Sequence, residues 1–484
     1  MNAADTESPA VLSGGRERII ITLLSCIAAV HVFIFCAAFP PINNVDESAH
    51  FDLAVKYSHG HLPGRLEPRS DEALGYIRIY ASQEYFWPPV QAAPGLPGGE
   101  VESQRANHES SQPPLYYALA GFWWKMGQWF GFGGGTLFYC LRFLNIMFVA
   151  ALVWLGYFAA RTVFPENLFA RLAVPALLAF LPQTAFYSIN NDVLSPLCFG
   201  AAFVCLARWL RAETPGAWLG AITGITLAAT FLAKMSNLPL LAVSAAAVLF
   251  KIIRYSKMKK LRALTSSFAS LYFCAALPMA AWATWCQIHF GDFTGSGAKA
   301  RYLGWTLKPA GEWWHHPIFT PHGAWTFVSR LVATFWQGEF WWHGKPLALP
   351  FVDMIYILTT LVVVAMVLAG HFSRTEEAQR QALCFALANL VAAVAFLASL
   401  SILYDFNDCF YPSREHPYFT SGRLMLGALI PFLLLFVFGL DRALSRFRNR
   451  AKFLVLVGTV LFMLNSEIVV DWPVFFSKGN WFHM

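Results

Sequence analysis

A short segment near the N-terminus, VDESAHF at residues 45–51, concentrates side chains that can do chemistry. Asp46 and His50 are four residues apart and Glu47 and His50 are three apart, so on a helix the three share one face. A carboxylate beside an imidazole can act as a general base or help to hold a divalent metal. The same spacing also suits an ordinary helix start, where acids favour the positive end of the helix dipole. Both interpretations stay open from the spacing alone.

The residues around this segment predict that it forms a helix. Asn44 or Asp46 can cap the first turn. Pro63 and Gly64 prevent the helix from continuing, so we expect it to end near Gly60. Its apolar residues predict a stripe that rests on the membrane, made of Ala49, Leu53, Ala54 and Tyr57.

Polar side chains that could join this site recur in four later segments: NHESSQPPLYY (107–117), YSINND (187–192), a turn at 234–237, and the start of an apolar run at 423. The residues concerned are His108, Glu109, Gln112, Asn190, Asn191, Asp192, Lys234 and Arg423. Each has an ordinary alternative, because Asn and Asp are common in turns and caps and Lys snorkels to a membrane surface. An Arg at that surface contacts lipid headgroups or pairs bidentately with a bound phosphate.

Hydropathy predicts what lies between these segments. Of the 484 residues, 57% are hydrophobic and 13% are charged, and apolar runs of 18 to 24 residues recur. A helix rising 1.5 Å per residue needs about 20 residues to cross roughly 30 Å of hydrocarbon. The runs are 19–39, 137–160, 168–189, 191–209, 217–234, 236–253, 266–285, 348–370, 382–403, 423–440 and 453–472. The sequence therefore predicts an all-α polytopic membrane protein with about 11 transmembrane helices.

The distribution of Lys and Arg predicts the orientation, because these residues favour short cytoplasmic loops. With a cytoplasmic N-terminus, that side holds 19 basic and 8 acidic residues. Three long connections, at 40–136, 286–347 and 404–422, then lie outside, and the first holds 10 acidic and 6 basic residues. Topology thus accounts for the net charge of +7, and nucleic acid is not expected as a partner. The first apolar run lacks a small-x-small cleavage site, so we expect an anchor rather than a signal peptide.

The outer connections are rich in aromatic residues. Residues 113–135 predict an interfacial helix on the outer surface. The Trp and His of 286–347 fit either an aromatic belt or a groove for sugar or prenyl chains. Four of the histidines in this connection match no metal template, and they are His315, His316, His322 and His343. Cys286 and Cys409 fall outside, where chemistry permits a disulfide.

Taken in order, five features resemble the GT-C superfamily of integral membrane glycosyltransferases, which transfer sugars from polyprenyl-phosphate carriers outside the cytoplasm. They are the DE pair after the first run, the E-x-x-x-PPLYY segment, the ND-type turn, the second large loop, and the GR run with a Pro eight residues after its Arg. The chain looks most like bacterial membrane proteins with a PPDE-x-AHF first loop, related to protein O-mannosyltransferases and aminoarabinose transferases. The resemblance implies a GT-C-like catalytic module over 1–285, a second outer loop over 286–347, and C-terminal transmembrane helices over 348–484.

The resemblance also implies roles for individual residues. Asp46 would be the general base or a metal-binding carboxylate, with Glu47 beside it as a second catalytic residue. Asp192 would fill the second acidic position, and Mg²⁺ or Mn²⁺ would bind to Asp46 and Asp192. Arg423 would approach the carrier phosphate. The other substrate-binding residues would be His50, His108, Glu109, Gln112, Asn191 and Lys234.

Two departures from the pattern affect this assignment. INNV separates the PP pair from DESAHF, and Gln112 stands where aminoarabinose transferases place a Lys. Recognition of the donor phosphate would then fall to Arg423, Lys234 or Arg105. The implied reaction is inverting displacement at the anomeric carbon, from a polyprenyl-phosphate sugar to a lipid, glycan or protein acceptor. Its implied setting is the bacterial cytoplasmic (inner) membrane and its lipids.

Three other classes of protein remain to be weighed. A transporter or flippase should carry ionisable groups within its spans and often internal repeats; the predicted spans carry few charges, and no repeat is evident. An oligosaccharide polymerase or ligase would depend on outer Arg and His residues and tolerate the loss of Asp46. A membrane scaffold leaves the clustered polar motifs unexplained.

The predicted orientation can be tested with reporter fusions. A reporter fused after Gly99 is expected to read outside, and one fused after Lys257 is expected to read inside. Paired alkaline phosphatase and fluorescent-protein fusions measure this directly, and the opposite pattern would overturn the topology.

Overall fold

Helices make up most of the computed structural model, which describes residues 14–81, 106–343, 345–369, 376–407, 409 and 411–483. Gly99 and Arg105 lie outside the described residues. The α-helices are α1 (Gly14–Ala38), α2 (Glu47–Ser58), α3 (Asp71–Tyr80), α5 (Leu115–Trp129), α6 (Gly134–Arg142), α7 (Leu144–Val163), α8 (Leu168–Ala179), α9 (Ser195–Arg211), α10 (Ala217–Ala233), α11 (Leu238–Lys257), α12 (Thr265–Phe290), α13 (Ser296–Tyr302), α14 (Pro321–Gln337), α15 (Pro350–Ala369), α16 (Glu377–Leu403), α17 (Leu429–Ala443) and α18 (Asn449–Asp471).

Short 3₁₀ turns and four two-residue strands complete the described chain. The 3₁₀ turns are η1 (Thr184–Tyr187), η2 (Met235–Asn237), η3 (Leu261–Ala263), η4 (Ala310–His315), η5 (Pro317–Phe319), η7 (Gly422–Ala428), η8 (Trp472–Phe476) and η9 (Trp481–His483). Strands β1 (Thr306–Leu307) and β4 (Tyr404–Asp405) pair antiparallel, as do β2 (Trp341–Trp342) and β3 (Lys345–Pro346). The β1–β4 pair joins the second and third of the predicted outer connections.

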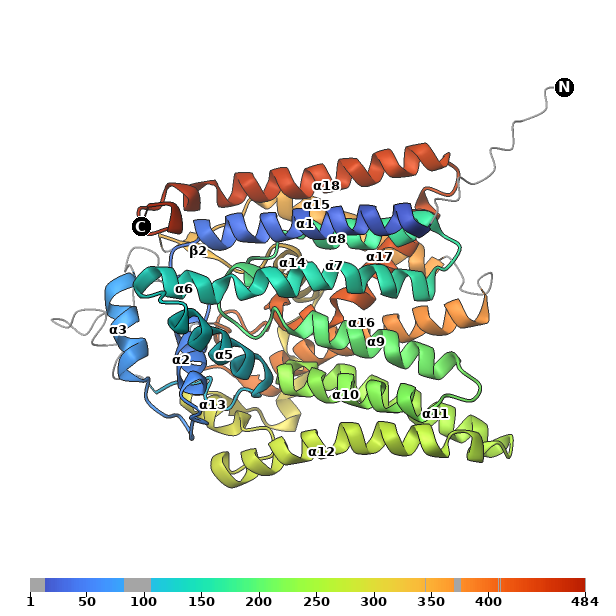
Figure 1. Ribbon diagram of the computed structural model, residues 1–484, viewed down its shortest axis with the longest axis horizontal. Coiled ribbons are helices and arrows are strands. Elements are labelled where there is room, and N and C mark those ends of the chain that lie inside the picture. The colour runs from blue at the N-terminus through green and yellow to red at the C-terminus, as the bar shows by residue number, and fades with distance from the viewer. Residues whose placement is uncertain are drawn as a thin grey trace.

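Long helices run side by side, and α2, α3, α5 and α13 gather at one end of them (Figure 1). Among the described residues, eight helical segments are long and apolar enough to cross a membrane. They are Gly14–Ala38, Gly134–Val163, Met235–Lys257, Thr265–Phe290, Pro350–Ala369, Glu377–Leu403, Gly422–Ala443 and Asn449–His483. The protein is therefore an all-α polytopic membrane protein, as predicted.

The other three predicted runs also hold helices, but these helices are short. Helices α8, α9 and α10 have 12, 17 and 17 residues. The predicted span 168–189 is interrupted because Pro182 follows soon after the end of α8 and has no N–H with which to continue a helix. At 1.5 Å per residue, α8 covers only about 18 Å. The chain from Phe180 onward then reaches the polar end through η1 rather than as one helix.

The first outer connection packs more closely than the sequence suggested. Helix α2 ends at Ser58, close to the predicted end. Its predicted membrane stripe is instead buried, and Ala49, Leu53 and Ala54 are all inaccessible to solvent. The stripe faces the protein because α5, the predicted interfacial helix, packs directly against α2, and a Cβ added to Gly121 would lie 2.6 Å from the Ser58 nitrogen.

All three predicted segments of the chain contribute side chains to one buried apolar cluster. Helix α14, from the second outer connection, packs on α15 and on η7, so that connection is fastened to the C-terminal helices. Cys286 and Cys409 are both free thiols, so the permitted disulfide is not formed.

The contact between α2 and α5 gives a stability prediction. Gly121→Ala should push the helices apart and destabilise the protein by about 1–3 kcal/mol, because the added methyl group meets backbone atoms that cannot rotate away. Gly75→Ala within α3 is the matched control, since nothing lies within 4 Å of its added Cβ, and it should leave the protein equally or slightly more stable. Thermal unfolding in detergent measures both, and equal melting temperatures would contradict the close packing.

Candidate functional site

Asp46 precedes α2 in an unusual backbone conformation. Its φ of 59° lies in the left-handed region, which costs a non-glycine residue roughly 1–2 kcal/mol. Asp46 occupies the N-cap position, as predicted, but its side chain makes no capping hydrogen bond. The carboxylate turns instead toward His108 and Arg423.

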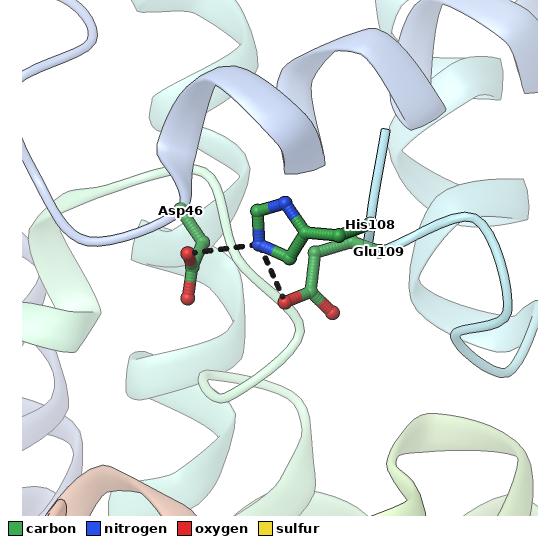
Figure 2. Close-up of side chains that lie close together, drawn as sticks. All are labelled: Asp46, His108 and Glu109. Atoms are coloured by element: carbon green, nitrogen blue, oxygen red, sulfur yellow. Dashed lines mark hydrogen bonds and ion pairs between the residues drawn. The ribbon is translucent and has the colours of Figure 1, made fainter. Parts of the chain in front are cut away.

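The imidazole of His108 lies between two carboxylates (Figure 2). Its Nε2 is 3.3 Å from an Asp46 oxygen and 3.4 Å from a Glu109 oxygen. Glu109 is almost fully buried and also accepts a hydrogen bond from Lys299 in α13. The Tyr302 ring of the same helix stacks parallel to His108, with the ring planes 8° apart. Ion pairs thus connect three segments that are distant in sequence, those of Asp46, of His108 and Glu109, and of Lys299.

Arg423, at the start of η7, connects this group to a second pair of acids. Its guanidinium donates to Asp46 over 2.6 Å and to Asp192 over 3.3 Å. Its Nε is 4.0 Å from Glu339 and has no hydrogen-bond partner among the described residues. Asp192 also forms a buried ion pair with Lys234, which therefore does not snorkel to the membrane surface.

The NND turn is built by its own side chains. The Asn190 side chain accepts from the Asp192 amide over 2.9 Å and donates to the Ala185 carbonyl over 2.8 Å. Asn191 donates to Gln112 over 3.0 Å, and Gln112 donates to Glu109 over 2.6 Å. The predicted residues at 108–112 and at 190–192 are therefore linked directly.

Two predicted residues are placed differently from the expectation. Glu47 points away from Asp46 into a fully buried ion pair with Arg142, at 2.6 and 2.8 Å, and accepts from the Ile189 amide. This ion pair links Glu47 to the last residue of α6, and the catalytic role predicted for Glu47 stays a prediction. His50 is buried, and its Nδ1 lies 2.6 Å from the Tyr117 hydroxyl.

Several charged residues of the site were missed in the sequence. Lys299, Glu339 and Arg142 carried no recognisable spacing, because each reaches the site from a distant segment. Glu339 belongs to the FWQGEFWWHG segment, and its negative charge among aromatic residues was the only feature that could have marked it as a site residue. In the structure it accepts hydrogen bonds from Ser421 over 2.6 Å and from Tyr411 over 3.4 Å.

The electrostatics follow from burial and pairing. Burial opposes ionisation of Asp46, but Arg423 and His108 outweigh it and hold the pKa of this carboxyl well below its usual range. Burial alone would lower the pKa of His108, yet hydrogen bonds to Asp46 and Glu109 raise it to about 9. Burial raises the pKa of Glu339, despite the opposing charge of Arg423.

The predicted metal ligands are only partly brought together. Asp46, His108 and Glu109 each offer a ligand atom within 4.8 Å of the others. Asp192 does not belong to this group because it faces Lys234 and the far side of Arg423. Two carboxylates and an imidazole suit a divalent cation such as Mn²⁺ or Zn²⁺, so the residues present fit a metal better than the predicted pair did.

The eight apolar segments and the polar group at one end define an integral membrane protein with a charged site beside its spans. The chain belongs to the family described as predicted membrane protein (DUF2142), whose profile matches residues 30–405. No curated protein matches the sequence.

Solved structures similar to this chain include an oligosaccharyltransferase of Archaeoglobus fulgidus tethered to an acceptor peptide, with 12% identity and a TM-score of 0.47 over 97% of this chain and 56% of that one. Archaeal AglB from the same organism, in complex with an inhibitory peptide and a dolichol-phosphate, matches with 12% identity and a TM-score of 0.41 over 94% and 56%. A complex of the oligosaccharyltransferase with Zn and sulfate matches with 14% identity and a TM-score of 0.36 over 76% and 45%. The chain spans about half the length of these proteins.

The burial of His50 predicts a pH dependence of stability. Desolvation lowers its folded-state pKa from 6.5 to about 4, so the unfolded state binds more protons between these values and stability falls as pH decreases from 6.5 to 4. The expected loss from this residue is up to about 3 kcal/mol. His50→Gln should remove that component, so thermal unfolding of wild type and variant should diverge in this window and run parallel above pH 7. Parallel curves throughout would show that His50 titrates normally.

Proposed function

We propose that the protein is a membrane glycosyltransferase that moves a sugar from a polyprenyl-phosphate donor to an extracytoplasmic acceptor with inversion. The observation that carries the proposal is the contact of Asp46 with Arg423, which sets a candidate base beside a candidate phosphate-binding group. The sequence motifs that resemble GT-C enzymes converge on the same residues.

Arg423 would bind the donor phosphate. Its planar guanidinium group can donate hydrogen bonds to two phosphate oxygens at once. The Nε of this group has no hydrogen-bond partner among the described residues. Lys234 is a further cation of the site, since it shares Asp192 with Arg423. The positive charge of both groups would stabilise the negative charge that grows on the departing phosphate.

Donor binding would also change the basicity of Asp46. The pKa of this carboxyl is low mainly because Arg423 outweighs the effect of burial. If a phosphate bound the Arg423 guanidinium in place of Asp46, the carboxyl of Asp46 would lose this positive partner and its pKa would rise. The carboxylate would then be a stronger base at the moment when the donor is in place.

The proposed step is a single displacement. The acceptor oxygen forms a bond to the anomeric carbon as the bond from that carbon to the phosphate oxygen breaks. Asp46 takes the acceptor proton, and the phosphate leaves with its electron pair beside Arg423. General-base assistance of this kind contributes about 10²- to 10⁴-fold to the rate.

If Asp46 instead has the alternative role of a metal ligand, a divalent metal would be held by Asp46, His108 and Glu109. When bound, such a cation supplies positive charge that stabilises a leaving phosphate. His108 would need to lose its proton to bind the metal, and Lys299 would need to share Glu109. His50, which is buried, and Gln112, which is partly buried, would support the rim of the site.

The remaining parts of the proposal concern setting and partners. The site would face away from the cytoplasm of a bacterial inner membrane, with the N-terminus inside. The acceptor would be a lipid, glycan or protein, and the surrounding partners would be membrane lipids. The domain boundaries at 285 and 347 belong to the same proposal.

A transporter is a second candidate function, because one observation favours it. His31 in α1 lies 2.7 Å from Glu467 in α18, and Tyr187 donates to the same carboxylate, so ionisable groups do occur within the spans. Transport would require these groups and not Asp46. A polymerase or ligase would likewise retain activity without Asp46.

Asp46→Asn is therefore expected to lower sugar transfer by about 10²- to 10⁴-fold, since the amide cannot accept the acceptor proton. Asn tolerates the left-handed backbone found here, so the variant should fold. Transfer from a polyprenyl-phosphate sugar in isolated membranes measures the effect, and an EDTA-treated sample tests the metal separately.

The matched control is Asp71→Asn, an exposed Asp in the first turn of α3. This change should leave transfer unchanged. Full activity of a correctly folded Asp46→Asn protein would remove Asp46 from the mechanism and favour the alternative functions.

A further inference from the structure

A long apolar groove runs between α1 and α18, which lie side by side along one edge of the molecule in Figure 1. We call it the α1–α18 groove. Its walls are Leu23, Ile27, Val30 and Ile34 on α1 with Leu464 and Ile468 on α18. The cavity has a volume of about 590 Å³. Both walls belong to segments long and apolar enough to cross a membrane, so the groove opens toward bilayer hydrocarbon.

The floor of the groove offers no polar group to an occupant. His31 lines it, but Nδ1 lies 3.1 Å from the Ala179 carbonyl and Nε2 lies 2.7 Å from Glu467, so both ring nitrogens are already engaged. Phe35 and Phe180 form the rest of the floor. Water does not fill an apolar cavity, because it finds no hydrogen-bond partners there. The chemistry that fits the groove is therefore a hydrocarbon chain.

The length of the groove indicates which hydrocarbon. Leu23 and Phe35 are twelve residues apart, which corresponds to about 18 Å along a helix. This is close to the depth of one leaflet, about half of the roughly 30 Å hydrocarbon core. A polyprenyl chain is longer than one leaflet, whereas a phospholipid acyl chain matches this depth. Trp472 and Phe475 lie at the outer end of the groove, where aromatic rings suit the headgroup level.

We propose that the α1–α18 groove binds an acyl chain of a membrane phospholipid in the leaflet at the Ala38 end of α1. The bound chain fills the space between the two helices and covers the wall behind which His31 and Glu467 are buried. The site is separate from Asp46 and Arg423, so it does not depend on the proposed glycosyltransferase activity.

Native mass spectrometry of the full chain, purified in a mild detergent, tests the proposal. The wild-type protein should retain phospholipid, and Val30→Trp, which fills the groove, should lower the retained amount about tenfold. Ile225→Trp on α10 is the matched control, because Ile225 is 55% exposed and Val30 58%, yet Ile225 does not line the groove. The control should retain as much phospholipid as wild type.

Leu464→Phe on the opposite wall repeats the test if Val30→Trp does not fold. Returning a phospholipid to the delipidated wild type should raise its melting temperature, and a polyprenyl alcohol should not. The proposal would be overturned if the wild-type protein retained no phospholipid, or if Val30→Trp and Ile225→Trp retained equal amounts. It would also be overturned if the bound mass were that of a polyprenyl phosphate, or if a dimer formed in place of the lipid complex.

Discussion

The buried ion pair between Glu47 and Arg142 is the interaction on which the rest of the site depends. Both side chains are inaccessible to solvent, and Arg142 also donates to the Phe39 and Pro40 carbonyls. Glu47 in turn accepts from the Ile189 amide. One pair therefore fixes the end of α1, the start of α2, the α6–α7 helix and the approach to the NND turn. Leaving either charge buried without its partner typically costs about 3–5 kcal/mol, so these four pieces are held together firmly.

Asp46 and Glu47 are neighbours in sequence, but their carboxylates have different partners. Glu47 pairs with Arg142, whereas Asp46 has a left-handed backbone and makes no capping hydrogen bond. Its carboxylate then projects toward Arg423 rather than back onto its own helix.

Local patterns allowed much of this arrangement to be predicted, and distant partners account for the rest. Hydropathy located the helices, and the acidic segment after the first apolar run drew attention to Asp46, which contacts Arg423 and His108. The direction of Glu47 was not predictable, because its partner Arg142 lies 95 residues away in an apolar helix. Lys299 was missed for the same reason, since only the folded chain brings α13 to Glu109. By contrast, the break after α8 had a local signal in Pro182.

The mutual pairing of charges in the site restricts what can bind there. Asp46 and Asp192 share Arg423, Asp192 pairs with Lys234, and Glu109 pairs with Lys299. A neutral ligand would have to separate these pairs without replacing either charge, which is costly in a buried setting. An anionic ligand can take the place of a carboxylate on Arg423 and leave the freed carboxylate beside its own polar groups. Under the proposed function, the donor phosphate would be that anion, and Asp46 would be the carboxylate that it releases from Arg423.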